Sequence, residues 1–377
     1  MFKSFINIII KVRFFFSSLN ILIDLKNIKP KIIFFSENKS YQKYSKPIID
    51  ILCSKLPGQI YYFSIDKDDK INDKRINNYF VNSLLINFIF NNIKAENMFL
   101  TLTDLGNNLI KKTKNINKYI YYFHSPVSTT KNYTSKAFDN YDVIMCNGQF
   151  QIDEIRSREY LKKLTKKKLI PSGYFYFDYL IKNINHNVDC NEILIAPSWN
   201  KNMRNFINEN FIELIDVLIK KKYRVTFRPH PEHFKRSKNI LDNIKNKFSK
   251  ESFKFDIDVN NIKSLEKAKC LITDSSGIAI EYMIALKRPV LYFDEHDKIH
   301  NSEFKDYSSL KTIDQEIKEN FGCLFKKKDF NQIDIIIKNS EEKLLKNLPK
   351  LERFVNDNYF NFGNTEKFLY SNFKEII

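Results

Sequence analysis

Glycine is scarce in this chain, at 7 of 377 residues. Glycine-rich phosphate loops need several glycines within a few positions, because the backbone there approaches a phosphate closely. The sequence contains no Walker-type loop, no GxGxxG after an expected strand and no GxSxG elbow. These absences exclude glycine-rich phosphate cradles, so any bound phosphate must be held by helix ends and side chains.

Cysteine is also sparse, and its 5 copies are widely spaced, without a CxxC pair. This odd number and spacing argue against a disulfide framework and against structural zinc, and they favour a reduced, cytoplasmic chain. The histidines outside the motifs described below show no ligand spacing with acids or thiols: His186, His233, His296 and His300. We therefore expect neither a metal nor a cofactor.

No apolar run in the sequence is long enough to span a bilayer. Residues 1–25 are rich in Phe and Ile, but Lys3, Lys11, Arg13 and Asp24 interrupt them. The broken apolar core and the lack of a small-residue cleavage site also argue against a signal peptide. We expect this segment either to lie on a membrane surface, at the cytoplasmic face, or to pack as a helix on the first domain.

Positive charge dominates, with 62 Lys and Arg against 44 Asp and Glu and a formal net charge of +18. No aromatic RNA-binding motif, zinc-finger spacing or long basic tail accompanies this charge, so nucleic acid is not expected as a partner. Two interpretations of the positive charge remain, attraction to an anionic substrate and attraction to lipid headgroups.

The hydrophobic fraction of 43% and the aromatic fraction of 15% predict a well-packed globular protein.

Short apolar runs typical of strands alternate with longer helical segments, which predicts an α/β protein with mostly parallel sheets. A polar, asparagine-rich stretch between Lys182 and Asn191 separates two such series. We therefore expect two doubly wound, Rossmann-like domains facing a central cleft, one at residues 1–183 and one, with C-terminal helices, at residues 192–377. Strands are expected at residues 31–35, 59–65, 98–102, 119–123, 142–146 and 169–170, and then at 192–196, 223–227, 253–256, 270–273 and 290–293.

The most informative segment is residues 271–294. An apolar strand passes into a helix, at residues 278–286, through small or capping residues: Asp274, Ser275, Ser276 and Gly277. At such a junction the first backbone N–H groups are unpaired and the helix dipole presents its positive end, which suits a diphosphate. An ordinary strand-to-helix connection with good capping chemistry is the alternative.

Polar residues also follow other expected strands, at the edge where open α/β sheets bind ligands. Arg228 and His230 alternate in a proline-stiffened RPHP segment, where Arg offers a planar fork for phosphate oxygens and His offers a donor. His124 is placed to act as a general base, or else to cap or fill the core. Ser198 and Trp199 follow the strand at 192–196, and Trp199 either stacks on a base or sugar or serves packing.

Together and in this order, these clusters resemble the CDP-glycerol glycerophosphotransferase family, the teichoic-acid polymerase and primase type of enzyme with a GT-B fold. The likeness covers roughly residues 115–300. The family's APTW segment is similar to residues 196–199, its RxHP to residues 228–231, and its TDYSSxxxDY to residues 273–282. Glu281 fills the acidic position of the last motif, and the family's GxPRxD turn is similar to the stretch containing Gly173 and Asp178.

The chain departs from the family pattern within these motifs. Ser275 stands at the position of the family's tyrosine, Gly277 at its second serine, and Tyr176 near its arginine. The family's catalytic histidine lies in a Trp-His-Gly-Thr-Pro-like motif, whereas residues 123–126 read FHSP here, so the glycine is missing.

The resemblance implies transfer of a glycerophosphate-like, polyol-phosphate unit from a CDP-activated donor to a hydroxyl, in synthesis of a teichoic-acid-like cell-surface polymer. The acceptor would be lipid-linked or a glycan, the first domain would be the acceptor side, CMP would be released, and no metal would be required. His124 would be the catalytic base, and His230 is a second catalytic candidate. Donor-binding candidates are Arg228, Asp274, Ser275, Ser276, Gly277, Glu281, Ser198 and Trp199.

An alternative enzyme is a GT-B glycosyltransferase, or a 2-epimerase-like relative, that uses a nucleotide sugar in surface glycan synthesis. The same diphosphate site would then serve attack at carbon instead of phosphorus. A basic protein that binds membranes or nucleic acid is the non-enzymatic alternative. The polyol of the donor, the acceptor, the choice between primase and polymerase, and the oligomeric state stay open.

Overall fold

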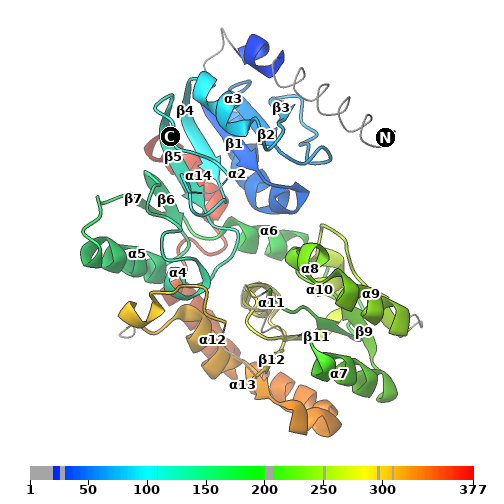
Figure 1. Cartoon of the computed structure of the whole chain (residues 1–377). Helices are drawn as coiled ribbons and strands as arrows, with labels where there is room; N and C mark the ends of the chain where they lie inside the picture. The colour runs from blue at the N-terminus through cyan, green and yellow to red at the C-terminus, as the bar shows by residue number, and fades with distance from the viewer. Residues whose placement is uncertain are drawn as a thin grey trace, which may run out of the picture. The chain divides into compact units, whose positions relative to one another are not determined.

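The computed structural model describes residues 20–25, 30–107, 109–199, 207–248, 252–294, 298–307 and 310–377. Most of the segment 1–25, expected to form an interfacial or a packed helix, lies outside the described residues. Within the part of the chain that the structure describes, no helix has the length and apolarity that a bilayer crossing requires. The described part contains two separate parallel sheets with helices packed around them (Figure 1).

The first sheet has seven parallel strands in the order β3-β2-β1-β4-β5-β6-β7. Every residue of β1, which reads IIFFS, and of β2, which reads IYYFS, is buried, as expected for parallel strands covered by helices on both faces. The strands are β1 (Ile32–Ser36), β2 (Ile60–Ser64), β3 (Ile76–Phe80), β4 (Ala95–Leu100), β5 (Ile116–Tyr122), β6 (Val143–Cys146) and β7 (Lys168–Pro171). The helices before the second sheet are η1 (Lys39–Tyr41), α2 (Gln42–Lys55), α3 (Ile86–Asn92), α4 (Thr129–Asn132), α5 (Gln149–Leu161) and α6 (Phe175–Asn183).

The second sheet has six parallel strands in the order β10-β9-β8-β11-β12-β13. The strands are β8 (Glu192–Ile195), β9 (Arg224–Phe227), β10 (Phe253–Phe255), β11 (Ala268–Thr273), β12 (Val290–Phe293) and β13 (Cys323–Phe325). The helices that follow β8 in the sequence are α7 (Glu209–Lys220), α8 (Pro231–Arg236), α9 (Lys238–Lys247), α10 (Ile262–Lys267), α11 (Ile278–Leu286), η2 (Phe304–Tyr307), α12 (Ile313–Phe321), η3 (Lys327–Gln332), α13 (Ile333–Asn358) and α14 (Thr365–Ile376).

Both sheets have the doubly wound strand order of Rossmann-like folds, in which the order reverses at one point. In the second sheet the reversal lies between β8 and β11, which pair directly. Loops that leave the strands at such a reversal diverge, and ligands of open α/β sheets bind beside them, beyond the carboxyl ends of the strands. The exits of β8 and β11 are therefore where a ligand of the second sheet is expected.

The chain divides into two compact units, and neither is continuous in sequence. The first unit comprises residues 1–124, 136–176 and 364–377, and the second comprises residues 125–135 and 177–363. The boundary expected between the domains 1–183 and 192–377 does separate the strands of the two sheets. It does not separate the units, because most of α6 belongs to the second unit and α14 returns to the first.

Burial of apolar side chains explains this return. Leu369 and Ile376 of α14 are fully buried in the core of the first sheet, together with Ile48 and Leu52 of α2. The sequence had led us to expect that all C-terminal helices pack on the second domain. Helix α14 instead packs on the first sheet.

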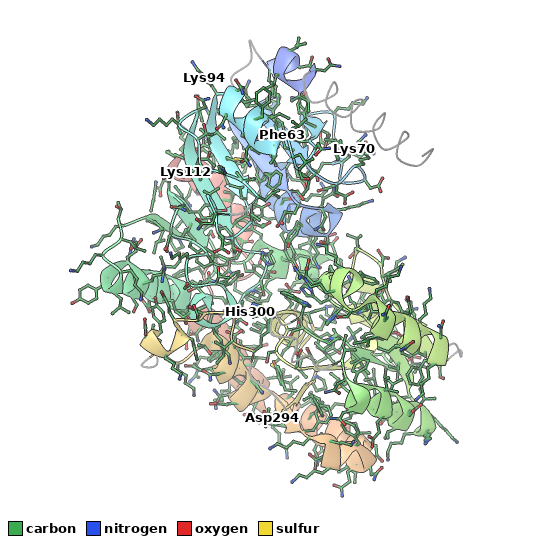
Figure 2. The ribbon with its side chains drawn as sticks, in the orientation of Figure 1. Phe63, Lys70, Lys94, Lys112, Asp294 and His300 are labelled. Atoms are coloured by element: carbon green, nitrogen blue, oxygen red, sulfur yellow. The ribbon has the colours of Figure 1, made fainter. Side chains whose placement is uncertain are left out.

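Aromatic side chains fill the core of the first unit. The rings of Phe34 and Phe99 stack with their centroids 4.7 Å apart, and Phe63 is fully buried. The lysines labelled in Figure 2 on this unit, Lys70, Lys94 and Lys112, are all exposed.

Candidate functional site

The turn between β11 and α11 lies at the carboxyl edge of the second sheet. Its backbone N–H groups at residues 275–278 form no hydrogen bond with any described residue, and neither do the hydroxyls of Ser275 and Ser276. The next N–H group, that of Ala279, is already paired with the Ser276 carbonyl at 3.0 Å. Unpaired donors thus gather at the positive end of a helix dipole, an arrangement suited to binding an anion.

A pocket of about 380 Å³ lies beside this turn, within the second unit. The residues that line it come from the turn, from the loop 125–135, from α12 and from neighbouring elements: Asp274, Ser275, Ser276, Lys131, Asn132, Asp314, Gln315, Lys318, Ile280 and Tyr292. Two lysines, Lys131 and Lys318, thus share the pocket with the two serines of the turn. This combination of cations and hydroxyl donors matches the chemistry of a phosphate group.

Half-buried side chains of opposite charge interact around this pocket. Asp314 accepts the Ser128 N–H at 2.9 Å and the Asn132 side-chain N–H at 3.0 Å, and burial raises the pKa of its carboxyl above the ordinary value. Burial lowers the pKa of Lys298, while the nearby carboxylates of Asp274 and Asp314 act in the opposite direction. A bound polyanion would therefore stabilise the charged form of Lys298.

Asp274 connects the two strand exits at the reversal point. Its carboxylate accepts the Ser198 N–H at 2.7 Å and the Ser198 hydroxyl, also at 2.7 Å. Ser198 follows β8 and Asp274 follows β11, so these bonds hold the two exits together. The structure thus brings together two of the predicted donor-binding residues, but it bonds their side chains to each other.

A buried histidine extends this network to the next loop. His233 of α8 is 0% exposed, its Nε2 lies 3.1 Å from the Ser198 carbonyl oxygen, and its Nδ1 lies 3.3 Å from the Ser237 hydroxyl. Because Nε2 faces a carbonyl, it carries the proton of the neutral ring, and burial lowers the pKa of this imidazole. Sequence reasoning considered His233 only as a metal ligand and missed this connecting role.

The two polar residues of the RPHP segment, Arg228 and His230, have different hydrogen-bond partners. Arg228 donates to the Asp256 carboxylate at 2.8 Å and to the Asp258 carbonyl at 2.6 Å. Burial acts to raise the pKa of Asp256, but hydrogen bonds and the Arg228 guanidinium outweigh it and lower the pKa overall. The Arg228 fork is therefore directed at the neighbouring β10 loop.

His230 is exposed and caps α8, where its Nδ1 accepts the Glu232 N–H at 3.2 Å. This bond places the proton of the neutral ring on Nε2, which can then act as a donor.

Trp199 and Glu281 are the remaining predicted donor-binding residues. The Trp199 ring lies 5.1 Å from the guanidinium carbon of Arg236, and its centroid lies 6.1 Å from that of His300. Glu281 is only 3% exposed, one turn into α11. Among the described residues, no group of three or more His, Cys, Asp or Glu side chains is placed to hold a metal ion, and all five cysteines are free.

In the first unit, His124 follows β5 and contacts two tyrosines. The imidazole centroid lies 5.4 Å from that of Tyr41, edge-on, and 6.1 Å from that of Tyr44. Tyr44 also lines a second pocket of about 230 Å³, at the carboxyl ends of β5, β6 and β7. His124 thus borders an aromatic pocket of its own unit.

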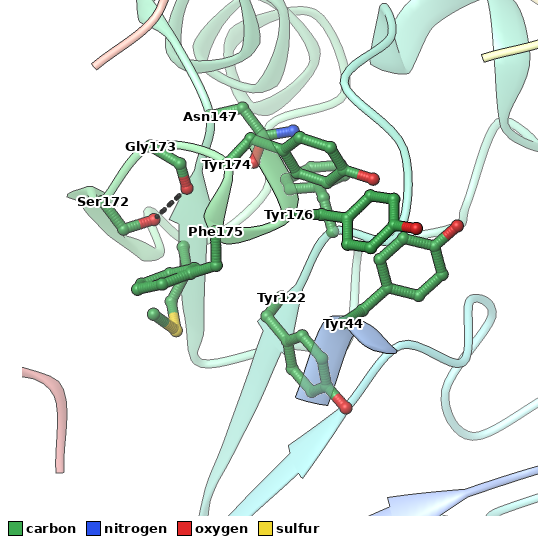
Figure 3. A pocket seen from close by; sticks show the side chains of 10 residues that line it. Tyr44, Tyr122, Asn147, Ser172, Gly173, Tyr174, Phe175 and Tyr176 are labelled. Atoms are coloured by element: carbon green, nitrogen blue, oxygen red, sulfur yellow. Dashed lines mark hydrogen bonds between the residues drawn. The ribbon is translucent and has the colours of Figure 1, made fainter. Parts of the chain in front are cut away.

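Tyrosines dominate this second pocket (Figure 3). The hydroxyls of Tyr44, Tyr174 and Tyr176 point to the same side, whereas that of Tyr122 points away from them. The Lys43 ammonium lies 4.9 Å from the Tyr44 ring centroid and 5.0 Å from that of Tyr176. A cation and several hydroxyls therefore occur together beside His124.

A family model described as CDP-glycerol:poly(glycerophosphate) glycerophosphotransferase matches residues 94–312, which is more than half of the chain. The match includes His124, the RPHP segment and the β11–α11 turn. No curated protein sequence matches the chain.

Solved structures with similar folds include the wall teichoic acid polymerase TagF, at 17% identity and a TM-score of 0.61, covering 93% of this chain and 90% of that chain. The Staphylococcus aureus MnaA structure with UDP is similar at 12% identity and a TM-score of 0.57, covering 92% and 96%. A putative UDP-N-acetylglucosamine 2-epimerase from Listeria monocytogenes is similar at 11% identity and a TM-score of 0.55, with the same coverage.

These likenesses and the two doubly wound sheets show a GT-B-like fold built from two Rossmann-like domains, and the family match shows a transferase that uses CDP-glycerol-type chemistry. The chain therefore belongs to the CDP-glycerol:poly(glycerophosphate) glycerophosphotransferase family.

Proposed function

We propose that this transferase extends a teichoic-acid-like surface polymer by moving a glycerophosphate unit from CDP-glycerol to a polymer hydroxyl. The observation that carries the proposal is the turn at residues 275–278, whose N–H and hydroxyl groups pair with none of the described residues and lie beside a lysine-bearing pocket. Family membership supports the donor, and the similar fold of a wall teichoic acid polymerase supports the kind of product.

In the proposed reaction the acceptor hydroxyl oxygen attacks the phosphorus that carries glycerol. A new P–O bond forms to the acceptor, the P–O bond to the CMP phosphate breaks, and CMP leaves with the bonding electron pair. His124 takes the proton of the attacking hydroxyl, so the products are the extended polymer, CMP and a protonated imidazole. Stabilising the charge that grows on CMP is then the main task of the donor site.

On the donor side, we propose that Ser275, Ser276 and the N–H groups up to Ile278 bind the diphosphate. Lys131 and Lys318 add positive charge at the same pocket. His230 donates through Nε2 to a phosphate oxygen, and its N-cap bond keeps that nitrogen protonated in the neutral ring.

The other predicted donor residues take a positioning role in this proposal. Asp274 and Ser198 fix the turn, because their side chains are bonded to each other. Arg228 holds the loop that carries His230, because its fork is already paired with Asp256 and the Asp258 carbonyl.

On the acceptor side, we propose that the tyrosine-lined pocket receives the end of the polymer. Tyr44 contacts both His124 and this pocket, which would bring the acceptor hydroxyl to the general base. The Lys43 ammonium offers a partner for the terminal phosphate of a polyol-phosphate chain. The net charge of +18 supports action on an anionic, lipid-linked acceptor at the cytoplasmic face of a membrane.

Product analysis tests the reaction. The purified chain is incubated with a lipid-linked acceptor and one donor at a time: CDP-glycerol, CDP-ribitol, UDP-glucose or UDP-N-acetylglucosamine. Matched reactions omit the acceptor. The released nucleotide is identified by chromatography. The proposal predicts CMP release that requires both acceptor and a CDP-polyol. Release of a nucleoside diphosphate from a nucleotide sugar would instead support the glycosyltransferase alternative and contradict this proposal.

Acceptor variants test the second pocket. Tyr44→Phe removes only the hydroxyl, and Lys43→Met removes the cation while keeping a similar chain length. Both are expected to raise the KM for acceptor and leave the KM for CDP-glycerol unchanged. Lys46→Met, at an exposed position of the same helix, is the matched control. If Lys43→Met and Lys46→Met raised the KM for acceptor equally, the proposal that this pocket binds the acceptor would lose its support.

A further inference from the structure

The Ser125 hydroxyl occupies the space that a side chain at residue 277 would need, so glycine is the residue that fits at this position. A Cβ added to Gly277 would lie 2.0 Å from the Oγ of Ser125 and 3.3 Å from its Cβ. The backbone does not require glycine, since Gly277 has φ −59° and ψ −25°, which any residue adopts. The constraint at this position is therefore the Ser125 side chain.

The Ser125 hydroxyl stands where a helix N-cap side chain would stand. Gly277 is the N-cap residue of α11, and no side chain of its own caps the helix. N-cap positions favour residues that bring an oxygen to the first turn, such as Ser, Thr, Asp and Asn. Here the oxygen beside the N-cap belongs to the loop 125–135 of the same unit.

Both segments also depart from the family motifs that the chain resembles. Gly277 stands at the position of the family's second serine, and no glycine follows His124. The structure places Ser125 against Gly277. A serine hydroxyl therefore lies beside the turn although residue 277 carries none.

We infer that Ser125 is a donor-binding residue, whose hydroxyl joins the N–H groups of residues 275–278 in holding the phosphate of the CDP-linked donor. This inference rests on the proposed function of the turn. A peptide bond also joins Ser125 to His124, so one loop would carry both a phosphate ligand and the general base. Donor binding would then fix the backbone next to the base.

Two double variants isolate the hydroxyl from its packing. Both Ser125→Gly/Gly277→Ser and Ser125→Gly/Gly277→Ala relieve the clash and place a Cβ at residue 277, and they differ by a single oxygen atom. CDP affinity is measured by titration calorimetry, the KM for CDP-glycerol by CMP release, and folding by the thermal midpoint. The single variant Gly277→Ala adds only the Cβ that clashes with the Ser125 hydroxyl, so it reports the effect of the steric clash alone.

The serine-bearing double variant is expected to bind CDP within about threefold of the wild type, and the alanine-bearing one about 10- to 100-fold more weakly, the usual effect of a hydrogen bond to a charged group. The alanine-bearing variant should have a somewhat lower thermal midpoint, because it lacks an N-cap oxygen, so the CDP affinities are compared at a temperature at which both variants are folded. Equal CDP affinities of the two double variants would overturn the inference and leave Ser125 with a packing role.

Failure of the inference can be told apart from failure of the proposed function. If the wild type releases CMP from CDP-glycerol but the two double variants behave alike, only the role of Ser125 is wrong. If the wild type binds CDP without transferring glycerophosphate, the proposed reaction is wrong, while the calorimetric comparison still decides the role of Ser125.

Discussion

Replacing the buried His233 with phenylalanine tests whether one hydrogen-bond network holds together the loops around the turn at residues 274–277. Phenylalanine keeps approximately the volume of the ring and removes both of its hydrogen bonds, to the Ser198 carbonyl and to the Ser237 hydroxyl. Ser198 in turn holds Asp274 through its N–H and its hydroxyl. The substitution thus acts on the turn without touching it.

The expected loss follows from the contacts. Two neutral hydrogen bonds contribute about 1 kcal/mol each, and a buried carbonyl left without its partner adds to the loss, so the free energy of unfolding should fall by about 2–3 kcal/mol. Since the network positions the turn, we also expect weaker CDP binding, while the thermal behaviour of the first unit should not change.

The size of this loss should depend on pH. Burial lowers the pKa of His233 below its ordinary value of 6.5. The unfolded chain therefore takes up a proton on this side chain at higher pH than the folded chain does. The stability that the neutral ring contributes is complete above the unfolded pKa and is lost as pH falls below it, so the wild type and the variant should differ more at pH 8 than at pH 5.

Urea unfolding followed by tryptophan fluorescence measures this effect in the relevant part of the molecule. Trp199 is the only tryptophan and belongs to the second unit, so its signal reports unfolding of that unit. His186→Phe is the control, because His186 is exposed and substitution there should change stability by no more than about 0.5 kcal/mol. An unchanged urea midpoint for His233→Phe at pH 8, or an equal loss at both pH values, would refute the reasoning.

Three further substitutions test the assigned roles. His124→Gln should lower kcat by about 10²- to 10⁴-fold, the usual contribution of a general base, and leave CDP affinity measured by calorimetry intact. His230→Asn keeps an N-cap acceptor for the Glu232 N–H, so its thermal midpoint should match that of the wild type. Its kcat/KM should fall at least about tenfold, because the Nε2 donor is lost. The control His186→Asn should change neither the thermal midpoint nor kcat/KM. Arg228→Lys cannot make both of the arginine's contacts and should cost about 1–3 kcal/mol in urea unfolding, with a raised KM for CDP-glycerol; an unchanged midpoint would argue against a positioning role.

Most strands that sequence analysis located are buried, continuous apolar runs, although it also located the partly exposed edge strands β7 and β10. Strand β1 is such a run, because helices cover both faces of a parallel sheet. Strand β3 (Ile76–Phe80), which reads INNYF, was missed because it lies at a sheet edge and only its first residue is buried. Strand β13 (Cys323–Phe325) was missed because three residues at the opposite edge of the second sheet carry no periodic signal.

The candidate site was predictable to the extent that it is local. The turn at residues 274–277 could be located because a strand, capping residues and a helix follow one another directly in the sequence. Lys131, Asp314 and Lys318 could not be assigned to it, since a loop and α12 bring them to the pocket only through tertiary packing. The contact between Ser125 and Gly277 likewise joins two segments that no local pattern relates.

The discontinuous first unit has a consequence for biosynthesis. Leu369 and Ile376 complete the core of the first sheet, but the ribosome makes α14 only after the entire second sheet. Until α14 is synthesised, part of the apolar surface of the nascent first sheet stays exposed. Exposed apolar surface of this kind makes folding intermediates prone to aggregation and a target for chaperones. Contacts between such distant segments also slow folding, and a fragment containing only residues 1–183 would lack the helix that closes its core.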